Sequence, residues 1–128
     1  MVQYLTMICD IKNSRSLEDR EVAQYKLIET LKSANKIFAS FIASPFIIII
    51  LGDEWQGLLN YPCDYMSILE FFHKNLEDID FYCGIGIGEI TIHNFELTVN
   101  QLDGPSFYKA RKAIEIVKQN NYSIVTIQ

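Results

Sequence analysis

The sequence predicts an α+β fold in which helices pack on one face of a mainly antiparallel sheet. Its apolar patterns follow the order strand, long helix, strand hairpin strand, helix, strand pair, helix, strand, which is typical of this class. The chain has 128 residues, of which 49% are apolar and 21% are charged. This is enough to bury one core without metal or disulfide staples, and we expect a single domain over residues 1–128.

The first two elements are a buried strand and an amphipathic helix. Residues 4–9 are apolar and lead directly into Asp10, so we expect a buried strand that ends in a carboxylate. Ser16 and Asp19 have the spacing of a helix-capping box. Apolar residues then recur every three or four positions, which predicts a helix over residues 17–39 whose apolar stripe packs on the sheet.

A hairpin over residues 46–59 is the feature around which the chain is organised. The run 46–51 contains six consecutive apolar residues; because it cannot alternate between faces, we expect a central strand that is buried on both. Gly52 and Asp53 form the turn into a second strand over 55–59. The turn chemistry alone explains both residues. Alternatively, Asp53 and Glu54 are carboxylates held on a rigid scaffold for metal or nucleotide binding.

Glycine recurs at every second position between Gly84 and Gly88. Within a strand over 81–90, this spacing leaves one face almost without side chains, so that another group must lie close to it. That group is either a helix backbone or a bound ligand. The spacing differs from that of the dinucleotide-binding fingerprint, which also precedes a helix rather than lying inside a strand.

Turn and cap residues divide the rest of the second half. Pro62 suits the first turn of a helix with an apolar side that extends to residue 76. Residues 93–102 are polar and irregular, which indicates a loop or an edge strand. Pro105 follows strong turn residues and begins a helix that ends near Asn120. Residues 122–127 form the last strand.

Composition excludes several classes of function. The net charge of -5 and the isoelectric point near 4.9 argue against a broad nucleic-acid surface, which would need clustered Lys and Arg. No apolar run approaches the roughly 20 residues of a membrane span, so we expect no membrane partner. Three cysteines without CxxC spacing fit reduced thiols in a core, and we expect a cytoplasmic protein.

Asp10 and Asp53 are the candidate metal ligands. If their strands are neighbours in the sheet, the two carboxylates lie at the same end of it, where they could bind Mg²⁺ or Mn²⁺ and neutralise a triphosphate. Glu54 could assist, although strand alternation points it away from Asp53. The cations most suited to meet phosphates are Lys12, Arg15, Lys109 and Arg111. Asp103 and Gly104 precede a helix whose N-terminal amides would add to that binding.

Four ordered motifs resemble the SatD family. The motifs are Asp10-Ile11-Lys12-Asn13-Ser14-Arg15, Gly52-Asp53-Glu54-Trp55-Gln56-Gly57, Gly84-Ile85-Gly86-Ile87-Gly88-Glu89 and Asp103-Gly104-Pro105-Ser106-Phe107-Tyr108-Lys109-Ala110-Arg111. The resemblance extends over nearly the whole chain. Members of that family usually continue into a C-terminal segment that resembles a helix-turn-helix, and we expect this chain to lack it.

More distantly, the layout is similar to the palm domains of class III nucleotide cyclases, GGDEF diguanylate cyclases and CRISPR polymerases. This resemblance implies a ferredoxin-like, palm-type sheet and a metal site formed by Asp10, the Ile11 position and Asp53. It also implies a role for Arg111 in catalysis. Two cyclase features differ: Phe107 stands where cyclases have an Asn, and the stretch before Gly52 contains no base-selecting Lys.

These observations give three functional hypotheses. The first is a domain that binds a nucleoside triphosphate through Mg²⁺ or Mn²⁺ and acts as a nucleotidyl cyclase or nucleotidyltransferase. The second is a catalytically degenerate regulatory or assembly module with the same fold. The third is a homodimer whose interface completes a site, with Trp55 and Tyr61 as contacts.

Overall fold

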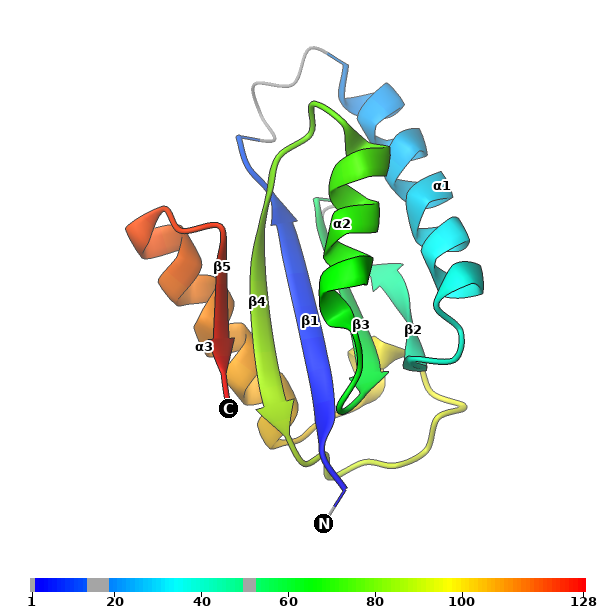
Figure 1. Ribbon diagram of the computed structural model, residues 1–128, viewed down its shortest axis with the longest axis vertical. Helices are drawn as coiled ribbons and strands as arrows, with labels where there is room; N and C mark the ends of the chain where they lie inside the picture. Colours follow the sequence, from blue (N-terminus) through cyan, green and yellow to red (C-terminus); the bar gives the residue numbers. More distant parts are fainter. Residues whose placement is uncertain (1, 14–18, 50–52) are drawn as a thin grey trace.

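The computed structural model describes residues 2–13, 19–49 and 53–128 of the chain (Figure 1). Its strands form one five-stranded sheet. In chain order the elements are β1 (Tyr4–Ile11), α1 (Arg20–Ile37), β2 (Ile42–Ile48), β3 (Glu54–Asn60), α2 (Tyr65–Leu76), β4 (Phe81–Gly88), η3 (Val99–Gln101), α3 (Pro105–Asn120) and β5 (Ile124–Ile127).

The sheet is mainly antiparallel, as predicted. The strand order is β2-β3-β1-β4-β5, so β1 lies in the middle. It pairs antiparallel with both β3 and β4, whereas the pairing of β4 with β5 is parallel. The two strands that were expected to bring Asp10 and Asp53 together are therefore neighbours.

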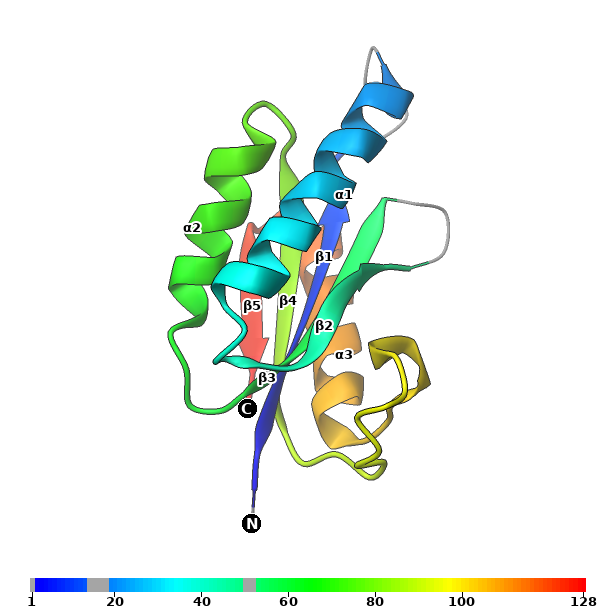
Figure 2. The same cartoon turned by 90° about the vertical axis from the view of Figure 1, so that its right-hand side faces the viewer.

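Helices cover both faces of this sheet, as Figure 2 shows. Side chains of β1 alternate between two cores: Leu5 and Met7 pack into the cluster that contains residues of α1 and α2, whereas Ile8 packs against Ala110 and Ile114 of α3. The α+β class is confirmed. The expectation that the helices pack on one face is wrong for α3, because the central strand is apolar on both faces and needs a cover on each.

Aromatic side chains fill the core beneath α1 and α2. The Phe72 ring lies 5.2 Å from that of Phe46 and 5.8 Å from that of Trp55, both edge to face, an arrangement that aromatic pairs favour. Trp55 has no exposed surface. The prediction that it contacts a second copy of the chain is therefore wrong, and Tyr61 is half-buried against the same core.

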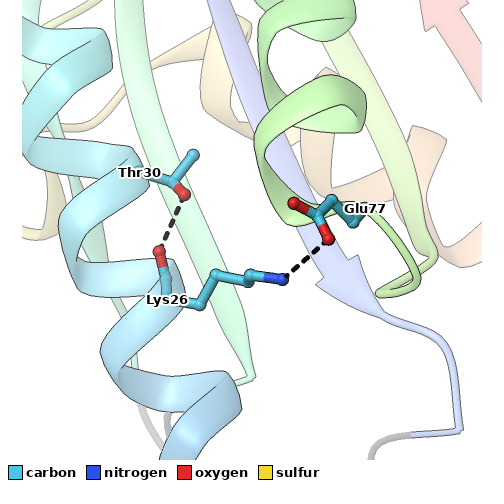
Figure 3. Close-up of polar contacts among 3 residues, drawn as sticks. All are labelled: Lys26, Thr30 and Glu77. Carbon is cyan, nitrogen blue, oxygen red and sulfur yellow. Dashed lines mark hydrogen bonds and ion pairs between the residues drawn. The ribbon is translucent and has the colours of Figure 1, made fainter.

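Figure 3 shows how α1 is tied to the end of α2. The Lys26 ammonium lies 3.5 Å from a carboxylate oxygen of Glu77, which follows the last residue of α2. On the same helix as Lys26, the Thr30 hydroxyl donates a hydrogen bond to the Lys26 carbonyl. An exposed ion pair of this kind stabilises by up to about 1 kcal/mol, so the buried core remains the main link between these helices.

The helix ends differ from prediction by a few residues. Asp19 is itself the N-cap of α1 and accepts a hydrogen bond from the Val22 N–H; Ser16, the expected cap, lies outside the described residues. Helix α2 starts three residues after Pro62, with Asp64 as its N-cap. Helix α3 begins at Pro105, as predicted. Side-chain caps thus outweighed proline in setting the start of α2.

The apolar run 46–51 does not form a central strand. Residues 46–48 belong to β2, which lies at the edge of the sheet, and Ile47 and Ile48 are only half-buried. The side chain of Asn35 from α1 occupies the open edge: it accepts from the Phe46 N–H at 2.8 Å and donates to the Phe46 carbonyl at 3.0 Å. An edge covered by a helix side chain is protected from further strand pairing, so this apolar strand needs no second neighbour there.

Residues 93–102 contain no β-strand. They include the single turn η3, and Val99 and Leu102 anchor them to Leu58 and Phe107 in a second, smaller core. The predicted strand pair is therefore one strand, β4, followed by a loop. Within the described residues no helix is long and apolar enough to cross a membrane.

The glycines of β4 let α3 approach the sheet closely. A Cβ atom added to Gly86 would lie 2.3 Å from the Ala110 nitrogen and 2.3 Å from the Ser106 oxygen; one added to Gly84 would lie 2.5 Å from the Ile114 nitrogen. Of the two predicted occupants of this face, the helix backbone is therefore the one present. The Ser106 hydroxyl fixes the helix start by bonding to Thr6 at 2.8 Å and to the Gly86 carbonyl at 2.9 Å.

We predict that Gly86→Ala lowers the free energy of unfolding by at least about 2 kcal/mol, because the new methyl group meets backbone that cannot rotate away. The matched control is Gly88→Ala, whose Cβ would be 3.3 Å from its nearest neighbours, one of them the flexible end of Lys109. We expect the control to change stability by less than about 1 kcal/mol. Urea unfolding followed by circular dichroism measures both, and equal effects would contradict the account.

Candidate metal and nucleotide site

Asp10 and the acidic residues of the hairpin, Asp53 and Glu54, lie at one end of the sheet. Asp10 is the second-last residue of β1, and Asp53 immediately precedes β3. The Ile11 N–H donates to the Asp53 carbonyl at 2.8 Å, which fixes the two chain segments side by side. The structure therefore brings together the two acidic strand ends that the sequence predicts as neighbours.

Glu54, rather than Asp53, lies directly opposite Asp10 in the register of β1 and β3. Because Ile11 turns its N–H toward the hairpin, the neighbouring Asp10 turns its backbone groups toward β4. The Asp10–Glu54 pair is thus of the type without mutual backbone hydrogen bonds, in which side chains lie closest. Like charges directly opposite each other destabilise a sheet, so this pair needs compensation.

Helix α3 packs on the face of the sheet that carries the Asp10 and Glu54 side chains, and it supplies two cations that balance their charges. The Arg111 guanidinium lies 2.7 Å from a carboxylate oxygen of Glu54, and the Lys118 ammonium forms an ion pair with Asp10. Both carboxylate side chains are mostly buried, with 13% of Asp10 and 19% of Glu54 exposed, whereas the two cationic side chains are nearly half exposed. The result is a semi-buried network of two acids and two bases.

Burial raises the pKa of the Asp10 carboxyl above its usual value, and the negative charges of Glu54 and Asp53 raise it further. Lys118 opposes this by a hydrogen bond and by its charge, without cancelling it. A carboxylate that is desolvated and crowded by other carboxylates favours any added cation. The electrostatics of the site therefore suit a divalent ion.

The carboxylates at this end of the sheet offer a metal ion few side-chain ligands. Among the described residues, no three His, Cys, Asp or Glu side chains are grouped so that they could hold a metal ion together. Mg²⁺ is usually held by one or two carboxylates, with water and substrate phosphates completing its octahedron. Asp10 and Asp53 could hold it in this way, with Glu54 beside them; the buried Ile11 could contribute only its backbone carbonyl.

The two buried cysteines of the central strands pack in the core beneath α1 and α2, on the face of the sheet opposite to the Asp10 side chain. Cys9 and Cys83 are free, buried and directly opposite each other on β1 and β4. Burial raises the pKa of Cys9 well above its usual value. The side chains that face α3 at this site, Asp10 and Glu54, carry oxygen donors.

Other predicted residues lie partly at this end and partly elsewhere. Lys12 follows β1, and its ammonium lies 5.0 Å from the centre of the Tyr82 ring, close enough for a cation–π contact beside the site. Arg111 is at the site through its ion pair with Glu54. Arg15 and Gly52 lie outside the described residues.

The structure does not bring Asp103, Gly104 and Lys109 to this end. The Lys109 ammonium donates to the Ile87 carbonyl at 3.1 Å. Ile87 is five residues along β4 from Tyr82, the partner of Asp10, or roughly 17 Å at the usual strand rise. Asp103 accepts from the Gly104 N–H, and Gly104 has φ 139 and packs on Ile90. All three hold the start of α3 instead.

Lys118 is the residue that sequence reasoning missed. Its signal is its spacing from Arg111: seven residues, or two helical turns, place both side chains on one face of a helix. The rest of that face, Ala110, Ile114 and Val117, is buried against the sheet. Two cations at this spacing beside a buried stripe could therefore have been predicted to form ion pairs with carboxylates at the end of a strand.

The fold is of the nucleotide cyclase-like, palm type. The family model described as SatD family matches residues 4–128, and the chain belongs to that family. No curated protein matches the chain.

The solved structures that are similar to it include the following two. One is the monomeric crystal structure of a double mutant of the guanylyl cyclase domain of the RhoGC fusion protein from the aquatic fungus Blastocladiella emersonii. It has 16% identity and a TM-score of 0.57, and the match covers 89% of this chain and 73% of that chain. The other is an EAL/GGDEF domain protein from M. capsulatus, with 18% identity, a TM-score of 0.51 and coverage of 95% and 84%. At these identities the likeness establishes the fold alone.

The raised pKa of Asp10 predicts a pH-dependent effect of Asp10→Asn on stability. A folded-state pKa above the unfolded value means that the carboxyl contributes most below the unfolded pKa, and that this contribution is lost as pH rises through the folded pKa. Asparagine mimics the neutral form at every pH. In metal-free buffer, Asp10→Asn should therefore be more stable than wild type at pH 8, and the difference should close toward acid pH.

Thermal or urea unfolding between pH 4 and pH 8 measures this difference. The control is Asp78→Asn, which changes an exposed carboxylate between α2 and β4 and should show no such trend. An Asp10→Asn protein that is less stable than wild type at pH 8 would refute the electrostatic account.

Proposed function

We propose that this SatD-family chain is a metal-dependent palm domain that binds a nucleoside triphosphate. In this proposal Asp10 and Asp53 hold Mg²⁺ or Mn²⁺, with Glu54 and the Ile11 carbonyl as additional donors, and Lys12 and Arg111 meet the phosphates. The observation that carries it is the placement of these residues at one end of the sheet: Glu54 lies opposite Asp10, and the Asp53 backbone is bonded to Ile11. Burial raises the pKa of Asp10 there.

The chemistry that fits such a site is nucleotidyl transfer. Asp10 and Asp53 would hold a divalent ion, which would neutralise a triphosphate and activate an attacking hydroxyl, and Arg111 beside them would stabilise charge on the transferred group. The neighbours of similar fold carry the names guanylyl cyclase and GGDEF, which supports a cyclase or a nucleotidyltransferase as the form of that reaction. A cytoplasmic location and a homodimer are further parts of the proposal, without Trp55 as a contact.

A second candidate is a non-enzymatic module that keeps the palm fold. The observation that favours it is the position of Phe107, which stands where the cyclase resemblance implies an Asn and is buried against Leu58 and Ile90. In this alternative, the ion pairs of Arg111 and Lys118 stabilise the fold and take no part in chemistry. A nucleotide product that forms from mixed triphosphates with wild type, but not with Asp10→Ala, would exclude this candidate.

The proposal predicts binding of ATP or GTP that requires Mg²⁺ or Mn²⁺ and is abolished in Asp53→Asn. Removing one of two carboxylate ligands leaves the ion too weakly held to bridge the phosphates. Isothermal titration with a non-hydrolysable analogue measures the affinity, and Asp78→Asn serves as the matched control that should bind like wild type. Absence of metal-dependent binding to wild type with either ion would reject the proposal.

A further inference from the structure

The ammonium of Lys118 forms an ion pair with a carboxylate oxygen of Asp10, one of the two proposed metal ligands. Lys118 lies in the last turn of α3 and forms its ion pair with Asp10 Oδ2. A metal ion bound at the same position on this oxygen would compete with the ammonium for it. Metal binding at this position would therefore displace Lys118.

The helix that carries Lys118 is not free to withdraw. Its backbone lies against Gly84 and Gly86 so closely that no Cβ would fit between them, and Ser106 bonds it to β1 and β4. The Lys118 side chain, in contrast, is 42% exposed and has four rotatable carbon–carbon bonds. Displacement is therefore a side-chain rotation, which leaves a positive charge in need of a new partner beside the site.

We propose that Lys118 holds the cation position on Asp10 while the site is free of nucleotide, and that the divalent ion enters together with a polyphosphate whose oxygens accept the displaced ammonium. This inference rests on the proposed function. It specifies that the site binds a complex of the metal with a polyphosphate rather than a free metal ion. Lys118 and Arg111, two turns apart on one helix face, then form the row of cations that faces the phosphate chain.

The inference gives the two ligands opposite responses to removal of Lys118. In Lys118→Met, Mn²⁺ alone no longer competes with the ammonium, so we expect it to bind about fivefold more tightly, the effect of losing one partly exposed ion pair. The preformed complex of Mn²⁺ with a non-hydrolysable ATP analogue loses a phosphate contact and should bind about fivefold more weakly. A purely structural role for Lys118 would shift both affinities in the same direction.

The experiment is isothermal titration of wild type, Lys118→Met and Lys118→Gln with each ligand. Lys112→Met, which changes an exposed lysine of the same helix, is the control and should match wild type. The double variant Asp10→Asn/Lys118→Met should lose Mn²⁺ binding, which assigns the tightened site to Asp10. Thermal melting checks that every variant is folded.

The outcomes separate the inference from the proposed function. Opposite shifts for the two ligands in both Lys118 variants would support the inference. If all proteins bind Mn²⁺ and the Mn²⁺ complex, but the shifts are absent or in the same direction, the inference is overturned and the proposed function stands. If neither wild type nor the Lys118 variants bind either ligand, both are overturned.

Discussion

The close contact between α3 and the glycine face of β4 is the constraint on which the rest of the structure depends. Gly84 and Gly86 have no side chains that would hold the helix away from the sheet. Ser106 bonds the first turn of the helix to β1 and β4. The helix axis is thereby fixed over β1 and β4. The cationic side chains of its second half consequently reach Asp10 and Glu54 at the other end of the sheet.

This arrangement accounts for an otherwise unfavourable pair of charges. Asp10 and Glu54 are mostly buried and lie directly opposite each other, a placement that destabilises a sheet unless cations balance it. Two cations from α3 offset the electrostatic cost of these carboxylates only in part, since the pKa of Asp10 remains raised. Groups that are costly for folding and clustered at a strand end are typical of functional sites.

Much of the fold and half of the site could be predicted from the sequence. Apolar strands with acidic ends, the glycine alternation and the Pro105 helix start depend on local patterns, and the structure confirms each. The edge position of β2 depends on Asn35 and Gly57, which lie in other elements: Asn35 covers the strand edge, and Gly57 makes room for the Phe46 ring. No pattern within residues 46–51 contains that information.

The other contacts of the site depend on the register between β1 and β3 and on the face of the sheet that α3 covers. Local sequence patterns contain neither. Register decides that Glu54, not Asp53, lies opposite Asp10, and a shift of one residue would reverse this. The assignment of Lys109 to phosphate binding followed from its place near a helix start, whereas the acidic strand ends face the second half of that helix. Lys118 became visible only when the helix was placed on the sheet.

The central claim is that Asp10 and Asp53 together bind a divalent ion that carries a triphosphate. The most direct measurement is anomalous diffraction from a crystal of the protein soaked with Mn²⁺ and a non-hydrolysable nucleoside triphosphate. The account predicts a manganese peak bonded to oxygens of Asp10 and Asp53 and to phosphate oxygens, with the Lys118 ammonium moved from Asp10. A well-ordered site with Lys118 still on Asp10 and no manganese between the two carboxylates would contradict it.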